Sequence, residues 1–190
     1  MNNILLAGVG GQGTVLASKL IAKCALAHGT PAHTAETIGM AQRGGCVVSH
    51  VRLGENCFSP LIPLGQAHTL IAFEPAEAVR CLPYLREDGN VIVSNTAVKP
   101  VTDALKPSYD AEAMLRFLQS TPYRVHVVDG VNICCECKTT KVLNIALLGA
   151  AAKLGLIGVS AAELEAIIDT EMKEKFREMN KKALRMAVNV

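Results

Sequence analysis

NILLAGVGGQGT, residues 3–14, is the stretch that decides the fold. Its first part, 3–9, is a short apolar run of the kind that forms a parallel strand covered on both faces. Residues 15–24 then carry apolar side chains at helical spacing, until Gly29 and Pro31 supply stop signals. A strand, a glycine turn and a helix make the first half of a βαβ unit, which predicts an α/β fold.

Gly8-Val9-Gly10-Gly11-Gln12-Gly13 satisfies the pattern G-x-G-x-x-G between the predicted strand and the predicted helix. Glycines at this place allow a tight turn and a close approach of backbone N–H groups to a ligand. The N-terminus of the following helix favours phosphate. The pattern predicts a ligand-binding loop, and a tight turn that binds nothing is the alternative.

Taken alone, the glycine loop suggests a free-standing oxidoreductase of Rossmann type that binds NAD(P) or a flavin. Such an enzyme needs an acidic residue at the end of its second strand, where it binds the ribose hydroxyls. Glu36, 23 residues after Gly13, is the candidate, and the Gln42-Arg43 loop that follows is not the usual continuation.

The remaining strands predict a mixed, mostly parallel sheet. Residues 31–38 and 46–53 are two strands joined by a polar, glycine-flanked loop, and strands joined so tightly must be antiparallel. Further buried strands are expected at 69–73, 90–94 and 124–129.

The helices are expected to flank this sheet in a single domain over residues 1–190. A helix begins at Pro75, and the excursion 97–122 holds another at 111–118. Residues 141–154 are apolar on nearly every side, which indicates a buried helix. Ser160-Ala161-Ala162-Glu163 has the form of a capping box. The stretch after Glu171 carries apolar residues at heptad-like spacing, so it packs on its own body or docks a partner. We expect the helical region from about 141 to 190 to pack on the sheet domain.

The composition excludes several classes of protein. Half of the residues are hydrophobic and 19% are charged, which fits a compact domain. The net charge of +2 forms no basic stripe and Trp is absent, so nucleic acid is not expected as a partner. The start of the chain does not read as a signal peptide. The longest near-apolar stretch, 145–152, is far below the about 20 residues that a membrane span needs. We expect a cytoplasmic protein without a membrane segment.

The seven cysteines are scattered, which predicts reduced and mostly buried thiols. Cys134-Cys135-Glu136-Cys137 contains a C-x-x-C, but a cluster or zinc site needs about four ligands and no second C-x-x-C follows. We interpret this group as a surface loop of reduced thiols. Metal binding is the alternative, and the role of the group stays open.

Four ordered motifs resemble one family. They are the glycine loop 8–13 and the segments 39–45, 59–63 and 72–78. They resemble the gamma subunit or domain of 2-oxoacid:ferredoxin oxidoreductases, and most of all the beta subunit of the indolepyruvate enzymes. Residues 144–149 also fit, so the resemblance covers nearly the whole chain. It implies a Rossmann-like domain of the pyruvate-ferredoxin oxidoreductase gamma type.

The resemblance also implies a function. In that family a thiamine diphosphate enzyme decarboxylates an arylpyruvate or another 2-oxoacid, electrons pass through 4Fe–4S clusters to ferredoxin, and the acyl group goes to coenzyme A. The thiamine sites and clusters belong to one or more larger partner subunits. This chain would be the small subunit, which is not catalytic alone and serves anaerobic metabolism. The identity of the 2-oxoacid, the stoichiometry, contact with coenzyme A and self-association as a homodimer stay open, as does a role as a pure assembly scaffold.

The resemblance assigns the site residues one by one. The candidates for binding a cofactor, with coenzyme A phosphates foremost, are Gly8, Gly10, Gly11, Gln12, Gly13 and Thr14. Gln42 and Arg43 are further candidates for binding the cofactor and would form a polar loop that faces the active site of the partner. Arginine binds phosphate or carboxylate bidentately, although a surface ion pair is the alternative for Arg43.

Glu74 and Glu77 flank the start of a helix, where a negative charge is favourable in any case, so we interpret them as structural. The sequence supports no Ser-His-Asp or Cys-His arrangement and no metal-ligand spacing. We therefore assign no catalytic residue and no metal site.

Overall fold

The computed structural model describes residues 1–37, 45–55, 57–99, 103 and 109–188. Within this part of the chain six strands form one sheet in the order β2-β3-β1-β4-β5-β6. The strands are β1 (Asn2–Val9), β2 (Ala32–Thr37), β3 (Cys46–Leu53), β4 (Ala67–Ala72), β5 (Leu85–Ser94) and β6 (Arg124–Val128). Neighbours among β1, β4, β5 and β6 are parallel, whereas β3 is antiparallel to both β1 and β2. The predicted mixed, mostly parallel sheet is confirmed.

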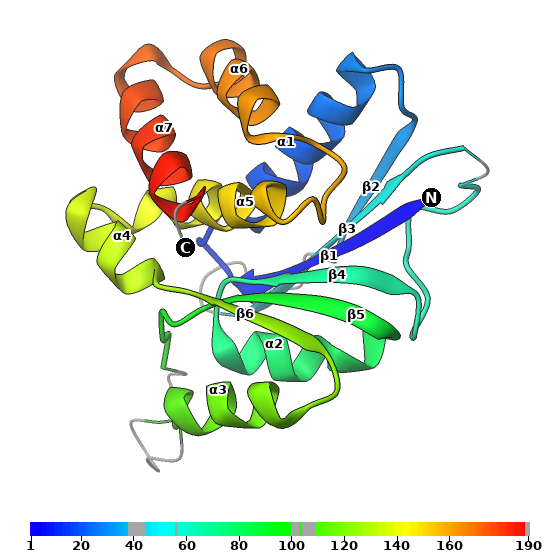
Figure 1. Ribbon diagram of the computed structural model, residues 1–190, viewed down its shortest axis with the longest axis vertical. Helices are drawn as coiled ribbons and strands as arrows, with labels where there is room; N and C mark the ends of the chain where they lie inside the picture. Colours follow the sequence, from blue (N-terminus) through cyan, green and yellow to red (C-terminus); the bar gives the residue numbers. More distant parts are fainter. Residues whose placement is uncertain (38–44, 56, 100–102, 104–108, 189–190) are drawn as a thin grey trace.

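Helices cover both faces of the sheet. They are α1 (Thr14–Ala27), α2 (Pro75–Cys81), α3 (Ala111–Ser120), α4 (Gly130–Glu136), α5 (Leu143–Lys153), α6 (Ala161–Glu171) and α7 (Glu174–Val188). Two short 3-10 turns, η1 (Leu82–Tyr84) and η3 (Thr140–Val142), precede β5 and α5. Figure 1 shows α1, α5, α6 and α7 on one face of the sheet and α2 and α3 on the other. The α/β class and the layered architecture therefore agree with the prediction.

The apolar run of β1 lies at the centre of this architecture. Ile4, Leu5, Leu6 and Ala7 have no exposed surface. Ile4 and Leu6 belong to the core under α1 and α5, whereas Leu5 and Ala7 belong to the core under α2 and α3. Successive side chains of a strand point to opposite faces, so one strand contributes to two cores.

Helix α5 is buried on all sides, as its sequence predicts. Every residue from Leu143 to Ala152 is buried, because α5 lies between the sheet and α7 (Figure 1). Gly149 lets the two helices approach closely, since a Cβ atom there would lie 2.7 Å from the backbone oxygen of Leu184. The side chains of Ala183, Leu184 and Ala187 on α7 are buried against this layer. The final helix thus packs on its own body.

The interpretation of the cysteine group as a surface loop is wrong. The group lies in α4 and at its C-cap, and the side chain of Asp129 caps this helix by accepting a hydrogen bond from the backbone N–H of Asn132 at 3.1 Å. Cys134 and Cys137 are buried in the main core, and Cys135 is exposed. Burial raises the pKa of both buried thiols. The sequence did not predict this short capped helix, because a polar residue followed by several cysteines is also typical of a surface loop.

Among the described helices, none combines the length and the hydrophobicity that crossing a membrane requires.

Candidate functional site

The topology of the sheet marks one edge as a ligand site. Strands β1 and β4 are parallel neighbours. The chain leaves β1 through α1 on one face of the sheet and leaves β4 through α2 on the other face (Figure 1). The place where the connections of two neighbouring parallel strands diverge in this way is called the switch point of the sheet. In open α/β sheets, ligands bind in the crevice outside the carboxyl ends of these strands. The glycine loop follows β1 at this point.

The glycine loop has a backbone that other residues adopt with difficulty. Gly11 and Gly13 have φ angles of +100° and +86°. A Cβ atom on Gly13 would also lie 2.8 Å from Nδ2 of Asn144, so both conformation and space exclude a side chain there. A Cβ atom on Gly11 would meet nothing within 4 Å. The backbone at Gly11 therefore borders open space.

The side chain of Gln12 ties the loop to the neighbouring strand. Its Oε1 accepts a hydrogen bond from the backbone N–H of Val9 at 2.7 Å, and its Nε2 donates to the backbone oxygen of Phe73 at 3.2 Å. Gly8 makes room for this arrangement, since a Cβ atom there would lie 2.8 Å from Oε1 of Gln12. The amide of Gln12 is thus engaged inside the protein, where it shapes the loop at the switch point.

The first turn of α1 has neither a side-chain cap nor an acidic residue. Gly13 is the N-cap and offers no side chain. Thr14, the first residue of the helix, is buried. The first backbone N–H groups of a helix have no partner within the helix and carry a partial positive charge. These groups can bind phosphate or carboxylate.

Two further segments meet the glycine loop. The backbone N–H of Gly10 donates to the backbone oxygen of Gly45 at 2.8 Å, so the segment that precedes β3 lies against the loop. Gln42 and Arg43, the predicted polar residues of that segment, lie outside the described residues. On the other side, Nδ2 of Asn144 lies 3.4 Å from the backbone oxygen of Gly13, to which it donates. The sequence alone did not predict this contact, because an asparagine in an otherwise apolar helix indicates a polar partner but not which residue it is.

Glu74 and Glu77 are buried beside the switch point. Oε2 of Glu74 accepts a hydrogen bond from the backbone N–H of Glu77 at 3.1 Å and so caps α2, and Oε1 accepts from the hydroxyl of Tyr109. Burial raises the pKa of Glu74, and the hydrogen bond from Tyr109 opposes this shift. Nε of Arg80 lies 3.3 Å from Oε2 of Glu77. The structural interpretation of Glu74 agrees with this geometry.

Glu36 does not lie where a Rossmann dinucleotide site needs an acid. It is part of β2, and β3 separates β2 from β1. Neighbouring strands are about 4.8 Å apart, so Glu36 lies two strand spacings from the glycine loop. Among the described residues, no group of three or more His, Cys, Asp or Glu side chains can hold a metal ion.

The fold and this edge define an α/β domain with a glycine loop at the switch point of its sheet. Residues 3–190 match the model of the pyruvate ferredoxin/flavodoxin oxidoreductase family, and the chain belongs to this family.

Relatives within the family are subunits of 2-oxoacid oxidoreductases. The indolepyruvate oxidoreductase subunit IorB of Archaeoglobus fulgidus is 35% identical over 98% of this chain and 94% of its own length. The pyruvate/ketoisovalerate oxidoreductases common subunit gamma of Pyrococcus abyssi is 30% identical over 98% of this chain and 95% of its own. The chain is thus a small subunit of the 2-oxoacid:ferredoxin oxidoreductase type.

Solved structures share the fold. The gamma subunit of a keto/oxoacid ferredoxin oxidoreductase from Geobacter sulfurreducens PCA matches with a TM-score of 0.73 at 23% identity, over 100% of this chain and 97% of the other. The 2-oxoglutarate:ferredoxin oxidoreductase of Magnetococcus marinus matches with a TM-score of 0.71 at 18% identity. That match covers 98% of this chain and 30% of the other, so there the same fold is one part of a longer chain.

Proposed function

We propose that this chain is the small subunit of an indolepyruvate or arylpyruvate ferredoxin oxidoreductase, and that its glycine loop binds the phosphates of coenzyme A. The first turn of α1, which follows Gly13 and has neither a side-chain cap nor an acidic residue, carries the proposal for the ligand. Relatives named IorB support the choice of 2-oxoacid, with 35% identity for that of Archaeoglobus fulgidus and 32% for that of Methanothermobacter thermautotrophicus.

The family indicates which subunits would hold the cofactors. Larger partner subunits would hold thiamine diphosphate and the 4Fe–4S clusters and would pass electrons to ferredoxin. The structure of the Magnetococcus marinus enzyme, in which this fold is part of a longer chain, has 2-oxoglutarate, coenzyme A and succinyl-CoA bound. It supports a place for coenzyme A in enzymes that contain this fold.

The residues present at the loop fit a phosphate group. The N-terminus of a helix carries about half an elementary positive charge, and backbone N–H groups point outward from it. A Cβ atom on Gly11 would meet nothing within 4 Å, so the loop that leads into this helix borders open space. When bound, coenzyme A supplies the thiol that receives the acyl group. This chain would bind and orient its phosphates, with Arg43 as the predicted cation beside them.

The strand order weighs against a free-standing NAD(P) or flavin enzyme, because β3 lies between Glu36 and the glycine loop. That alternative expects nicotinamide or flavin binding that depends on Glu36. The proposed function expects no redox activity from the isolated chain.

A thermal-shift titration with coenzyme A, NAD, NADP and FAD tests the ligand, on the chain alone and on its complex with the partner subunit. A ligand at 100 times its dissociation constant stabilises a native protein by about 2.7 kcal/mol. We expect a shift with coenzyme A that Gly11→Ala abolishes. Gly29→Ala is the matched control, because Gly29 also has a positive φ angle, +76°, and nothing within 4 Å of an added Cβ. A shift with NAD or FAD alone would support the alternative. No shift with coenzyme A, even in the complex, would contradict the proposed ligand and support a role of this chain as a pure assembly scaffold.

A further inference from the structure

A groove of about 570 Å³ opens on the helical side of the molecule, beside the first turns of α1. Leu16 of α1 forms one wall, and Thr139 and Lys141 at η3 form another. The third wall is the corner between α6 and α7. The residues that line it there are Glu171, Met172, Lys173, Phe176, Met179 and Asn180.

Four of the residues that line the groove are apolar and partly exposed to solvent: Leu16, Met172, Phe176 and Met179. Leu16 and Phe176 keep 42% and 40% of their surface exposed, and Met172 and Met179 are half-buried. Methionine side chains are flexible and polarisable, so they adapt to an apolar partner. The heptad-like spacing of the last helix thus serves two purposes. Ala183 packs on the body, and the apolar residues nearer its start line this groove.

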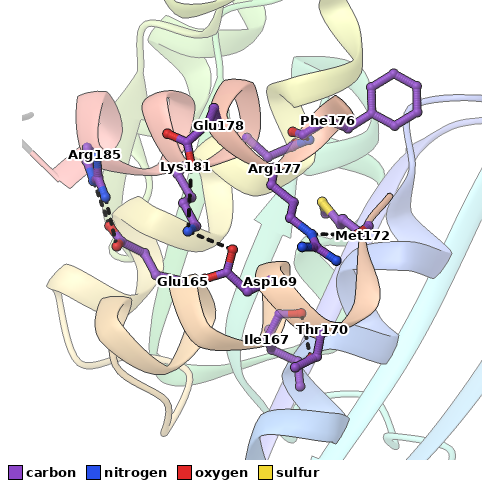
Figure 2. A network of polar contacts seen from close by, with 11 residues as sticks. Glu165, Ile167, Asp169, Thr170, Met172, Phe176, Arg177, Glu178, Lys181 and Arg185 are labelled. Atoms are coloured by element: carbon purple, nitrogen blue, oxygen red, sulfur yellow. Dashed lines mark hydrogen bonds and ion pairs between the residues drawn. The ribbon is translucent and has the colours of Figure 1, made fainter. Parts of the chain in front are cut away.

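Polar contacts on another side of α7 hold the groove in shape. Nζ of Lys181 lies 2.7 Å from Oδ1 of Asp169, and Arg185 donates two hydrogen bonds to Glu165 at 2.8 and 3.0 Å. Nε of Arg177 donates to the backbone oxygen of Met172 at 3.0 Å. Figure 2 shows these contacts between α6 and α7, and the ring of Phe176 points away from them. The groove is therefore preformed.

Two of the three charged residues that line the groove are lysines. Glu171, the carboxylate on the groove, forms an ion pair with Lys23. Neither Lys141 nor Lys173 has an ion-pair partner in the part of the chain that the structure describes. Lys175 lies 4.9 Å from the centre of the Phe176 ring and adds a third positive charge nearby. An occupant with carboxylates next to apolar side chains would complement this surface.

We propose that this groove is the docking site of an acidic amphipathic helix from the larger, cofactor-bearing subunit. The inference rests on the proposed function, since it assumes that such a subunit exists. Apolar side chains spaced one helical turn apart enter between Leu16, Met179 and Phe176, as in other helix-in-groove complexes. Carboxylates on the flanks of the docked helix pair with Lys141 and Lys173.

Binding of the full chain to the purified larger subunit, measured at low and high salt, tests the charges. Lys141→Glu combined with Lys173→Glu is expected to weaken binding about tenfold or more and to reduce its salt dependence. Arg86→Glu combined with Arg124→Glu is the control, because both arginines are exposed on strands far from the groove and the change in charge is the same.

A second pair of variants tests the apolar side chains of the groove. Phe176→Ser is expected to weaken binding about tenfold as well. Phe117→Ser is its control, because Phe117 is 51% exposed on α3, on the opposite face of the sheet. Thermal unfolding of each variant alone verifies that it folds.

The outcomes separate the inference from the proposed function. Binding of the larger subunit that neither groove variant weakens overturns the docking site and leaves the proposed function intact. A wild-type chain that binds no larger subunit overturns both. A homodimer of the isolated chain that Phe176→Ser disrupts, seen by light scattering, overturns the larger subunit as the occupant in favour of a second copy.

Discussion

The two faces of the sheet are covered to different depths. On one face α1 and α5 contact the sheet and α7 covers α5, so that ten consecutive residues of α5 are buried. On the other face α2 and α3 form a single layer, and Leu118 is the buried residue of α3. Both faces receive side chains from the same strands.

The difference shows how the apolar pattern of a helix depends on the number of layers that cover it. A helix between two layers has no side that faces water, so its sequence loses the amphipathic pattern, as in α5. A helix in a single layer needs one apolar stripe, as in α3. We therefore expect substitutions on the two faces to differ in cost, and the following variants test this from the largest effect to the smallest.

The largest effect is expected at the contact between α5 and α7. In Gly149→Val, the new Cβ atom would meet backbone atoms of Leu184 at 2.7 and 3.2 Å, which cannot move without shifting α7. We expect the free energy of unfolding to fall by about 3 kcal/mol or more, measured by urea unfolding. Ala113→Val on the outer helix α3 is the control, with a change within about 0.5 kcal/mol. Equal losses would contradict the difference between the faces.

Truncation of a buried leucine sharpens the comparison. Leu147 on α5 and Leu118 on α3 both have no exposed surface. We expect Leu147→Ala to cost about 3 kcal/mol and Leu118→Ala about 2 kcal/mol, because the surroundings of a single outer helix can relax into the cavity more readily. Chemical denaturation of the two variants measures both values. A larger loss of stability in Leu118→Ala than in Leu147→Ala would contradict the conclusion that the face with α5 is covered more deeply.

Glu74, the cap of α2 on the thinner face, gives that face a pH dependence. Burial raises the pKa of Glu74 above that of the unfolded chain. Its contribution to stability is therefore fully present below the unfolded pKa and is lost as the pH rises through the folded pKa. The free energy of unfolding of the wild type relative to Glu74→Gln should fall as the pH rises through the acidic range. Melting temperatures across that range measure it, and a difference that grows with pH would show that the sign is wrong.

The smallest effect is expected at the ion pairs of the outer layers. Lys181 retains 15% of its side-chain exposure and pairs with Asp169, which is 47% exposed. Lys181→Ala should lower the free energy of unfolding by about 0.5–1 kcal/mol, less at high salt. Arg116→Ala on α3 is the matched control, because its pair with Glu112 at 3.6 Å is far more exposed and should contribute nothing measurable. A loss at Arg116 as large as that at Lys181 would remove this part of the comparison.

The sequence by itself determined most of the local structure. The apolar run 3–9, the apolar segment 141–154 and the capping box at Ser160 predicted β1, α5 and α6, because periodicity and caps depend on neighbouring residues alone. The four motifs also determined the family, because four motifs in a fixed order along the chain are far more specific than one glycine loop.

Only the tertiary structure decided how distant segments meet. It placed β3 between β1 and β2, joined Gln12 to Phe73, brought Asn144 to Gly13, and folded Cys134 into the core. Strand order and side-chain partners depend on which surfaces pack together in space, and residues 131 positions apart carry no local signal of their contact. The predicted strands and helices therefore supplied the parts of the candidate site, and the packing of the sheet with its helices supplied its geometry.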